Sequence, residues 1–541
     1  MKLVTGGQMR EMEQIAVNEL GIPSILLMEN AAAHLADHCL RYLQSIENPK
    51  NNQNSSVLIA AGPGNNGGDG LALARLLHTK GVNVKAILTG DMSYAKGDAA
   101  EYLSIVKKLG IQIEQFNKKN ILLLDDIPDI KTVIETADLT VDALLGTGLD
   151  RGVEGKIKEL IEAINCYAKY VISADMPSGV HSDTGRVMGC AVRADETVTF
   201  GFPKIGLYAF PGAEYAGRIH IEDIMIPARL IDIIDAKAEI LTVDEAQKML
   251  PARGNCQHPG SRVMRHPIKL RTNKGTFGKI AVFAGSDEMP GAAALTCGAA
   301  YKTGGGLVCA CVLPHVADVI HHWQRETVTR ILPEKNGMYS KKCVEMAKEE
   351  IHSSDVIIIG PGIGRSPDVT EFVHELIVIS QEIPKPPPLV IDADALFALS
   401  EDVNIFKQLK APCIITPHPG EMSRLTGWPI PEILDDIINT AVSFAGTFNV
   451  VTLLKDAHTV IASPDGRYFL NTTGNNALSK AGTGDVLTGM IAGYIAQGKD
   501  VFSAGVLGAH FHGKAGEAAS EKKTLYGVMA GDLLEGVWLS L

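Results

Sequence analysis

The chain has 541 residues, which is too long for one hydrophobic core, so we expect at least two domains. Hydrophobic residues make up 46% of the chain and charged residues 21%, which is typical of a soluble globular protein. The formal net charge of -12 argues against a nucleic-acid surface, and the absence of a long apolar run excludes a membrane span.

The first residues turn polar too soon for a signal peptide, so we expect a cytoplasmic protein. Nine scattered cysteines show neither a disulfide framework nor a paired zinc spacing.

The first half of the chain begins with two expected helices, Gln8 to Leu20 and Pro23 to Leu40, where apolar residues recur at helical spacing. The apolar run from Ser56 to Gly62 predicts a buried strand of the parallel type. It precedes a glycine-rich loop, Pro63 to Gly70, and a helix through residues 71–77. Strand, glycine loop and helix together are typical of the phosphate-binding unit of an open α/β sheet.

Two further strands end in polar residues. Asp142 lies in an apolar strand before Gly146, and Asp175 follows another strand shortly before Ser178. Ligands of open parallel sheets bind at the carboxyl ends of the strands, so these side chains and Asn66 are candidates to converge. An oxygen-only cluster suits a hard cation. The alternative is that both aspartates only cap the segments that follow them.

We place the domain boundary near residue 230, with a first domain over 1–230 and a second over 231–541. Residues 251–273 are rich in Pro, Gly, Arg, Asn and His, as expected of a connecting segment. A basic cluster there either steers an anionic ligand or is a solvated loop. It comprises Arg262, Arg265, Lys269, Arg271 and Lys274.

The second half again alternates strands and helices, which predicts a second α/β sheet. We expect strands at 279–284, 307–313, 356–359, 389–391, 413–416 and 450–455, and helices at 291–302, 369–380 and 432–448. The strand ends carry Gly360 to Gly364, Asp392 with Asp394, His418 to Glu421, and Lys455.

The segment Ala481-Gly482-Thr483-Gly484-Asp485 opens an apolar helix expected from about Val486. Free N–H groups at a helix N-terminus hold phosphate, and an aspartate there can take a proton from an attacking hydroxyl. The alternative is a turn and helix cap without catalytic function.

With both halves considered, the chain resembles the bifunctional NAD(P)HX repair enzymes. In these an NAD(P)HX epimerase precedes an ADP-dependent NAD(P)H-hydrate dehydratase of ribokinase-like fold, where NADHX and NADPHX are the hydrated forms of NADH and NADPH. The motifs that carry the resemblance are Met28-Glu-Asn-Ala31, Gly62-Pro-Gly-Asn-Asn-Gly-Gly-Asp-Gly70, Val141-Asp-Ala-Leu-Leu-Gly-Thr-Gly-Leu149, Asp175-Met-Pro-Ser-Gly179, Gly360-Pro-Gly-Ile-Gly364, Thr416-Pro-His-Pro-Gly-Glu421 and Ala481-Gly-Thr-Gly-Asp485.

The resemblance implies an α/β protein with an N-terminal Rossmann-like three-layer domain followed by a ribokinase-like domain. The first domain would epimerise R- and S-NAD(P)HX. The second would dehydrate the S epimer to NAD(P)H at the expense of ADP, with release of AMP and phosphate. Potassium in the first domain, ADP or ATP with Mg²⁺ in the second, and a homo-oligomer are also implied.

The resemblance assigns site residues as well. Potassium would be held by Asn66, Asp142 and Ser178. Asp175 and Asp485 would be catalytic, with Asp485 acting as base on the hydroxyl of the hydrate. The epimerase substrate would contact Asn65, Asn66, Gly67, Gly68, Asp69, Gly146, Thr147, Gly148, Leu149, Asp150, Arg151, Gly152 and Asp175.

In the second domain the substrate would contact Gly362, Gly364, His418, Pro419, Gly420, Glu421, Met422, Ser423, Arg424 and Asp485. The nucleotide would contact Lys455, Asp456, Ala457, His458, Thr459, Asn475, Asn476, Ala477, Leu478, Ser479, Lys480, Ala481, Gly482, Thr483 and Gly484.

The chain departs from the family pattern at Asp456, Asn476 and Lys480 and has an insertion between Gly254 and Thr272. Lys480 either approaches an ADP phosphate or obstructs the usual packing. Two alternative functions stay open at this point: a ribokinase-like kinase of a small alcohol or vitamin, and an N-terminal domain that only binds or assembles.

Overall fold

The computed structural model describes residues 1–46, 55–89, 95–116, 130–251 and 272–540. The chain divides into two compact units, Lys2–Ala238 and Glu239–Leu541, the latter together with Met1. The expected insertion and most of the basic cluster, Arg262 to Arg271, lie outside the described residues. Among the described residues, no helix has the length and hydropathy needed to cross a bilayer.

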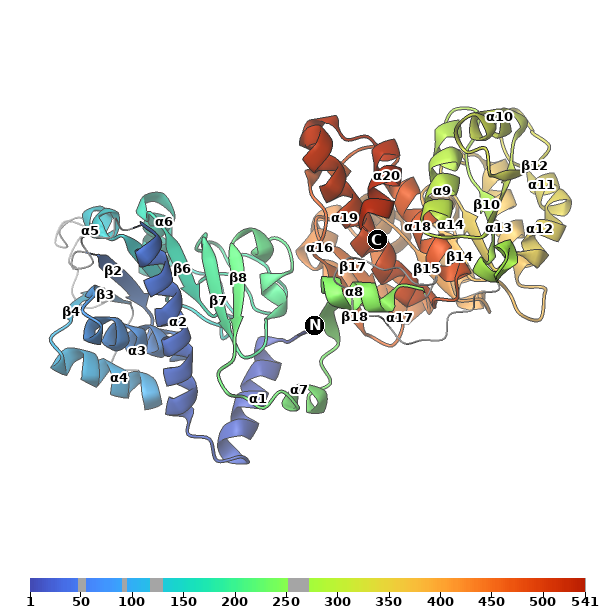
Figure 1. Ribbon diagram of the computed structural model, residues 1–541. Helices are drawn as coiled ribbons and strands as arrows, with labels where there is room; N and C mark the ends of the chain where they lie inside the picture. The colour runs from blue at the N-terminus through green and yellow to red at the C-terminus, as the bar shows by residue number, and fades with distance from the viewer. Residues whose placement is uncertain (47–54, 90–94, 117–129, 252–271, 541) are drawn as a thin grey trace. The chain divides into compact units, whose positions relative to one another are not determined.

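The N-terminal unit is built on a seven-stranded sheet in the order β4-β3-β2-β5-β6-β7-β8, and all neighbouring strands are parallel (Figure 1). The strands are β2 (Ser56–Ala61), β3 (Asn83–Thr89), β4 (Gln112–Phe116), β5 (Leu139–Ala143), β6 (Val171–Ala174), β7 (Glu196–Phe200) and β8 (Arg218–Glu222). The order reverses between β2 and β5. Ligands of doubly wound sheets bind at such a switch point.

Helices cover both faces of this sheet. They are α1 (Gly6–Asn18), α2 (Ser24–Ile46), α3 (Asn65–Thr79), α4 (Gly97–Lys108), α5 (Ile130–Thr136), α6 (Gly155–Tyr167) and α7 (Leu230–Ile233). Alternate residues of β2 belong to separate cores: Val57 and Ile59 pack with α1 to α4, whereas Leu58 and Ala60 pack with α5 and α6. The unit therefore has three layers, as expected.

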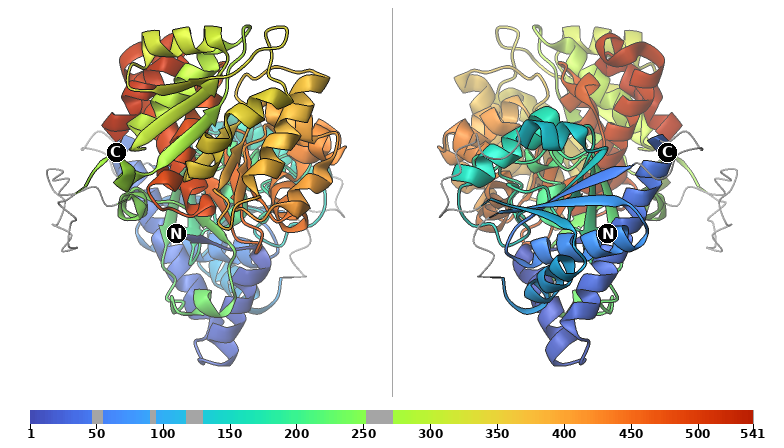
Figure 2. Two further views of the ribbon diagram at one scale, coloured as in Figure 1. Left: turned by 90° about the vertical axis from the view of Figure 1, so that its right-hand side faces the viewer. Right: turned by 90° about the vertical axis from the view of Figure 1, so that its left-hand side faces the viewer.

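The C-terminal sheet runs in the order β9-β18-β17-β16-β15-β14-β13-β10-β11-β12. It is parallel from β16 to β12, and β17 and β18 form an antiparallel hairpin. The strands are β9 (Ala238–Ile240), β10 (Lys279–Phe283), β11 (Leu307–Val312), β12 (Val328–Ile331), β13 (Val356–Ile359), β14 (Leu389–Ile391), β15 (Cys413–Ile415), β16 (Val451–Leu454), β17 (Thr459–Ala462) and β18 (Tyr468–Asn471). This sheet lies between two helical layers (Figure 2).

The C-terminal helices are α8 (Val243–Met249), α9 (Pro290–Lys302), α10 (Pro314–Trp323), α11 (Lys341–Met346), α12 (Lys348–Ser353), α13 (Pro367–Ser380), α14 (Asp394–Leu399), α15 (Pro419–Thr426), α16 (Ile430–Asp435), α17 (Ile437–Phe448), α18 (Thr483–Ala496), α19 (Val501–Gly527) and α20 (Ala530–Ser540). The strand order reverses between β10 and β13. The carboxyl ends of β13 to β16 therefore lie along one edge beside a second switch point.

Two expected elements differ from the structure. The glycine loop Pro63 to Gly70 is mostly the first turns of α3, which begins at Asn65. The single helix expected over 432–448 is two helices, because Asp436 leaves helical geometry (φ -145°, ψ 65°) and its side chain caps α17 by accepting from the Asn439 N–H. A polar residue within an apolar-periodic run can cap a new helix as well as continue the old one.

Candidate active sites

A cavity of about 840 Å³ opens in the N-terminal unit at the carboxyl ends of β2, β5, β6 and β7. It therefore lies at the switch point of the sheet, where an α/β fold binds its ligand. Ten of the residues expected to contact substrate line it: Asn65, Asn66, Asp69, Gly146, Thr147, Gly148, Leu149, Asp150, Arg151 and Asp175. A volume of several hundred Å³ is typical of small-molecule sites.

Three expected contact residues do not line the cavity. Gly67 and Gly68 are buried inside the first turn of α3, where a Cβ on Gly67 would lie 1.8 Å from the Gly62 carbonyl oxygen and one on Gly68 would lie 2.7 Å from the Met28 methyl. Gly67 therefore lets the start of α3 approach the end of β2, and Gly68 leaves room for Met28 of α2. Gly152 is exposed at the end of the following loop.

Asp175 follows β6 and is held by an ion pair with Lys204, a lysine whose side chain is only 1% exposed. The Lys204 ammonium also donates to Thr199 Oγ1 (3.1 Å) and to the Phe200 carbonyl (2.9 Å). Asp175 has a left-handed backbone (φ 63°), a strained conformation that occurs preferentially at functional sites. Its carboxylate accepts from the Phe200 N–H (3.3 Å) at the end of β7, so it does not merely cap the segment after β6.

Two further carboxyl groups line the same cavity. Burial, and then the charge of Asp175, raise the pKa of Glu13 above its usual range. Burial, followed by the charges of Asp175 and Glu13, raises the pKa of Asp69 well above its ordinary value. The cavity thus combines the Asp175–Lys204 ion pair with two carboxyl groups whose pKa values are raised, which is an arrangement suited to proton transfer.

Two members of the oxygen cluster expected at the strand ends, Asp142 and Ser178, are joined by hydrogen bonds. Asp142 is fully buried and accepts hydrogen bonds from Ser178 Oγ (2.5 Å), Ser178 N–H (2.8 Å) and Ser173 Oγ (2.8 Å). Burial raises its pKa, and these hydrogen bonds oppose the shift. Asn66 is buried, and neither polar atom of its side chain has a hydrogen-bond partner among the described residues. A buried amide without hydrogen-bond partners destabilises the fold unless a bound ligand interacts with it.

In the C-terminal unit, a buried charge network joins the ends of β14, β15 and β16. The Lys455 ammonium lies 3.0 Å from Asp392 Oδ1 and 3.9 Å from Glu421 Oε2. Asp392 also accepts from Thr488 Oγ1 of α18 (2.7 Å), so this helix is tied to the centre of the sheet. Burial alone would lower the pKa of Lys455, but Asp392 and Glu421 outweigh it and raise the pKa.

Asp485 lies in the first turn of α18, after Gly482, whose left-handed backbone (φ 90°) forms the N-cap. Its carboxylate makes no hydrogen bond to any described residue, so the helix-cap alternative does not account for it. Burial, and next the charge of Asp392, raise the pKa of Asp485 to about 7. A general base is most effective with a pKa near the working pH.

Some of the other residues expected to contact the dehydratase substrate lie beside the charge network, and others have side chains that point elsewhere. Gly364 N–H donates to Asp394 Oδ2 (3.0 Å), and Glu421 accepts from the His418 N–H (2.9 Å), so both lie at the strand ends beside the charge network. Met422 is fully buried in the core, and Ser423 Oγ donates to the Trp428 carbonyl (2.6 Å) at the far end of α15. The side chains of Met422 and Ser423 are therefore engaged elsewhere.

The comparisons with known proteins cover both units. Residues 24–206 match the family model "YjeF-related protein N-terminus", and residues 280–537 match the model "NAD(P)H-hydrate dehydratase". The bifunctional NAD(P)H-hydrate repair enzyme Nnr of Moorella thermoacetica is 38% identical over 99% of this chain and 96% of its own length. The Nnr of Thermofilum pendens is 34% identical over 97% and 93%.

The chain belongs to the bifunctional NAD(P)H-hydrate repair enzymes. This confirms the family, the fold class and the two-activity interpretation over the alternative of a small-alcohol kinase with a non-catalytic N-terminal module. Among solved structures, the ADP/ATP-dependent NAD(P)H-hydrate dehydratase from Bacillus subtilis, co-crystallised with ATP/Mg²⁺, is 29% identical. It has a TM-score of 0.45 over 56% of this chain and 96% of that one.

The expected nucleotide segments of this repair enzyme lie next to Asp485. Residues 455–458 form the turn between β16 and β17, and Asn475 caps a short 3₁₀ turn, Asn476–Leu478, by accepting from the Ala477 N–H (3.0 Å). Thr483 Oγ1 donates to the Leu478 and Lys480 carbonyls (both 2.9 Å) and so closes the loop. Ala477 is fully buried and Leu478 packs beside Gly474 and Gly516, so these two side chains shape the loop from inside.

Lys480, which departs from the family pattern, makes a hydrogen bond within the C-terminal unit. Its ammonium donates to the Tyr526 carbonyl (2.6 Å) near the non-helical Thr524 in α19. The lysine thus joins the loop to α19.

Sequence reasoning missed several residues near the sites, because no motif around them indicates a function. Lys204 is a single lysine in the glycine- and proline-containing stretch after β7, and Glu13 shares a helix face with the buried Met9 and Met12. His512 of α19 lies nearly thirty positions beyond the Asp485 loop, yet its Nε2 is 2.9 Å from the Thr483 carbonyl. Burial lowers its pKa to about 4, so the neutral ring donates to that carbonyl at neutral pH.

Proposed function

We propose that the C-terminal unit dehydrates S-NADHX and S-NADPHX to NADH and NADPH with ADP or ATP, and that the N-terminal unit interconverts the R and S epimers. With ADP the products are AMP and phosphate. The observation that carries the dehydratase assignment is the Asp485 carboxylate. It has no hydrogen-bond partner among the described residues, has a pKa of about 7, and lies at the start of α18 beside Lys455 and Asp392.

The dehydration follows from that arrangement in two steps. Asp485 takes the proton of the hydrate hydroxyl as the hydroxyl oxygen attacks the terminal phosphorus of ADP, and the bond from that phosphorus to AMP breaks. The lone pair of the ring nitrogen then expels phosphate to give an iminium ion, and the adjacent ring carbon loses a proton to the departing phosphate, which restores the dihydronicotinamide. The positive charge of Lys455 and the free N–H groups at the start of α18 support the negative charge on the phosphate. Mg²⁺ bound together with ADP would offset the negative charge of the phosphates.

For the epimerase, we propose that substrate occupies the 840 Å³ cavity against Asp175. The donor set beside the cavity fits potassium: the Asn66 side-chain oxygen, the Asp142 carboxylate and Ser178 Oγ are all hard oxygen ligands. Potassium there would balance the charge of Asp142. We place the boundary between the two activities between residues 230 and 231. The two compact units divide a few residues later, between Ala238 and Glu239.

The dehydratase is tested on NADHX prepared as mixed epimers, by the recovery of absorbance at 340 nm. The expected result is recovery that needs ADP or ATP and Mg²⁺. A chain that phosphorylates small alcohols but leaves NADHX unchanged would overturn the proposal.

The epimerase is tested with chromatographically separated S-NADHX incubated without nucleotide, so that dehydration cannot occur. Appearance of the R epimer should be faster in potassium than in lithium chloride of the same ionic strength. Asp142→Asn should remove the difference between the two salts. Equal rates in both salts for the unmodified chain would contradict the potassium assignment.

The cytoplasmic location and the homo-oligomer expected from the sequence stay predictions. Fractionation of the native host and light scattering of the purified chain would test them.

A further inference from the structure

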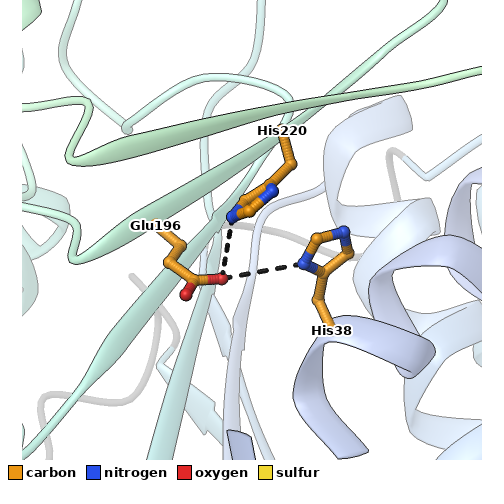
Figure 3. Close-up of side chains that lie close together, drawn as sticks. All are labelled: His38, Glu196 and His220. Atoms are coloured by element: carbon orange, nitrogen blue, oxygen red, sulfur yellow. Dashed lines mark ion pairs between the residues drawn. The ribbon is translucent and has the colours of Figure 1, made fainter. Parts of the chain in front are cut away.

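Two histidines and a glutamate meet on the N-terminal unit away from the cavity. His38 comes from α2, Glu196 is the first residue of β7, and His220 lies in β8 (Figure 3). The cavity is lined instead by Phe200, the last residue of β7. A strand rises about 3.3 Å per residue, so the cluster and the cavity are about 13 Å apart along β7.

The three side chains direct their polar atoms toward one another. Glu196 Oε2 lies 3.6 Å from His38 Nδ1 and 3.2 Å from His220 Nε2. All three ligand atoms lie within 4.8 Å of one another. Ligands bound tetrahedrally to zinc at about 2.0–2.1 Å are separated by about 3.3 Å, so two of these distances are close to those around a single ion.

The remaining atoms of two of these side chains are held by a second set of residues. His38 Nε2 lies 2.8 Å from Glu222 Oε1, so Nδ1 is the ring nitrogen that faces Glu196. Glu196 Oε1 accepts from the Tyr170 hydroxyl (2.9 Å) and from Arg218 (3.3 Å), which leaves Oε2 for the cluster. Metal-binding histidines usually have such a carboxylate partner on the other ring nitrogen.

His220, the third residue of the cluster, has a ring nitrogen without a hydrogen-bond partner among the described residues. His220 Nε2 is inaccessible to solvent and makes no properly angled hydrogen bond to the described residues, although Glu196 Oε2 is near. The other charged groups around the cluster are His34, paired with Glu222 Oε2 (3.0 Å), and Arg41 and Arg218.

We propose that His38, Glu196 and His220 form a binding site for Zn²⁺ that joins α2 to β7 and β8, with water as the fourth ligand. Two imidazoles with one carboxylate suit zinc and its transition-metal neighbours, whereas Mg²⁺ and potassium prefer all-oxygen sites. The cation would lie among two ring nitrogens and one carboxylate oxygen that already face one another. The site is separate from the potassium and Mg²⁺ assigned above.

The test uses the full chain without an affinity tag, stripped with a chelator and dialysed. Zn²⁺ is titrated against a chromogenic zinc indicator in excess Mg²⁺ and potassium. We expect one zinc per chain. His220→Ala should weaken this binding by at least about 100-fold and Glu222→Gln by about 10- to 100-fold. His78→Ala, an exposed histidine of α3, should bind zinc like the unmodified chain.

A second measurement does not depend on a folded variant. Crystals of the unmodified chain grown with Zn²⁺ should show an anomalous peak at the zinc absorption edge between His38, Glu196 and His220. A peak only at other residues, no zinc bound in the titration, or unchanged binding by His220→Ala would each overturn the proposal.

Discussion

In the proposed mechanism, dehydration by the C-terminal unit depends on the charge of one carboxylate, that of Asp485. The substitution Asp485→Asn keeps the size of the side chain but removes the base, so dehydration of S-NADHX should fall by about 10²- to 10⁴-fold. The measurement is the initial rate of absorbance recovery at 340 nm. Asp318→Asn, the same change at an exposed position of α10, is the matched control and should keep full activity.

The pH dependence of dehydration follows from the same residue. The pKa of Asp485 is about 7, so the carboxyl group is protonated below that pH and cannot accept the substrate proton. The rate at saturating substrate should therefore rise about tenfold per pH unit well below 7 and level off above it. A rate that is flat from pH 5.5 to 8.5 would show that Asp485 is not the base.

The buried lysine of the N-terminal unit gives a prediction about stability as well as activity. Lys204→Met leaves Asp175 without its ion-pair partner, and removal of one partner of a buried pair costs about 3–5 kcal/mol. Asp175 borders the cavity and can gain water, so we expect the lower end of that range. Calorimetry of the N-terminal transition and the epimerisation rate are both measured. Lys158→Met, at an exposed position of α6, is the control.

At the scale of elements, the contact between α9 and α18 places the Asp485 helix. Two glycines of α18, four residues apart, allow this approach: a Cβ on Gly489 would lie 2.2 Å from the Thr296 carbonyl oxygen, and one on Gly493 would lie 2.0 Å from Thr303 Oγ1. Glycine is weak in a helix, so its presence there reflects close packing.

Gly489→Ala should therefore destabilise the C-terminal unit by about 1–3 kcal/mol through overpacking, although alanine favours the helix. The lower midpoint of the C-terminal transition in calorimetry is the readout. Gly291→Ala on α9 is the control, because nothing lies within 4 Å of a Cβ at that position. If Gly489→Ala were as stable as the control, the helix contact would not be as close as described.

Much of the element pattern could be predicted from the sequence, because buried parallel strands read as short apolar runs and their ends carry glycine or polar residues. The sequence could not show that α3 begins at Asn65, since a run with four glycines looks like a loop until the close contact with Gly62 is known. It also did not show the break at Asp436, because the apolar period continues across it.

At the scale of the whole molecule, the two candidate sites belong to different units with separate sheets. Asp175→Asn should abolish conversion of R-NADHX to S-NADHX while dehydration of pure S-NADHX continues at the unmodified rate. Asp485→Asn should abolish dehydration of S-NADHX while conversion of R-NADHX to S-NADHX continues at the unmodified rate. Both rates are measured on separated epimers by chromatography. Loss of both activities in either variant, with the chain still folded, would contradict two independent sites.

The sequence by itself determined the family, the α/β class, the strand-end positions of Asp142, Asp175 and Lys455 and the helix-start position of Asp485, because these depend on local patterns and short motifs. Only the tertiary structure decided which residues that are distant in the sequence contact one another. Lys204 reaches Asp175, Thr488 reaches Asp392, and His38 meets Glu196 and His220. Strand order and helix packing create these contacts, and neither is encoded in the spacing of the residues along the chain.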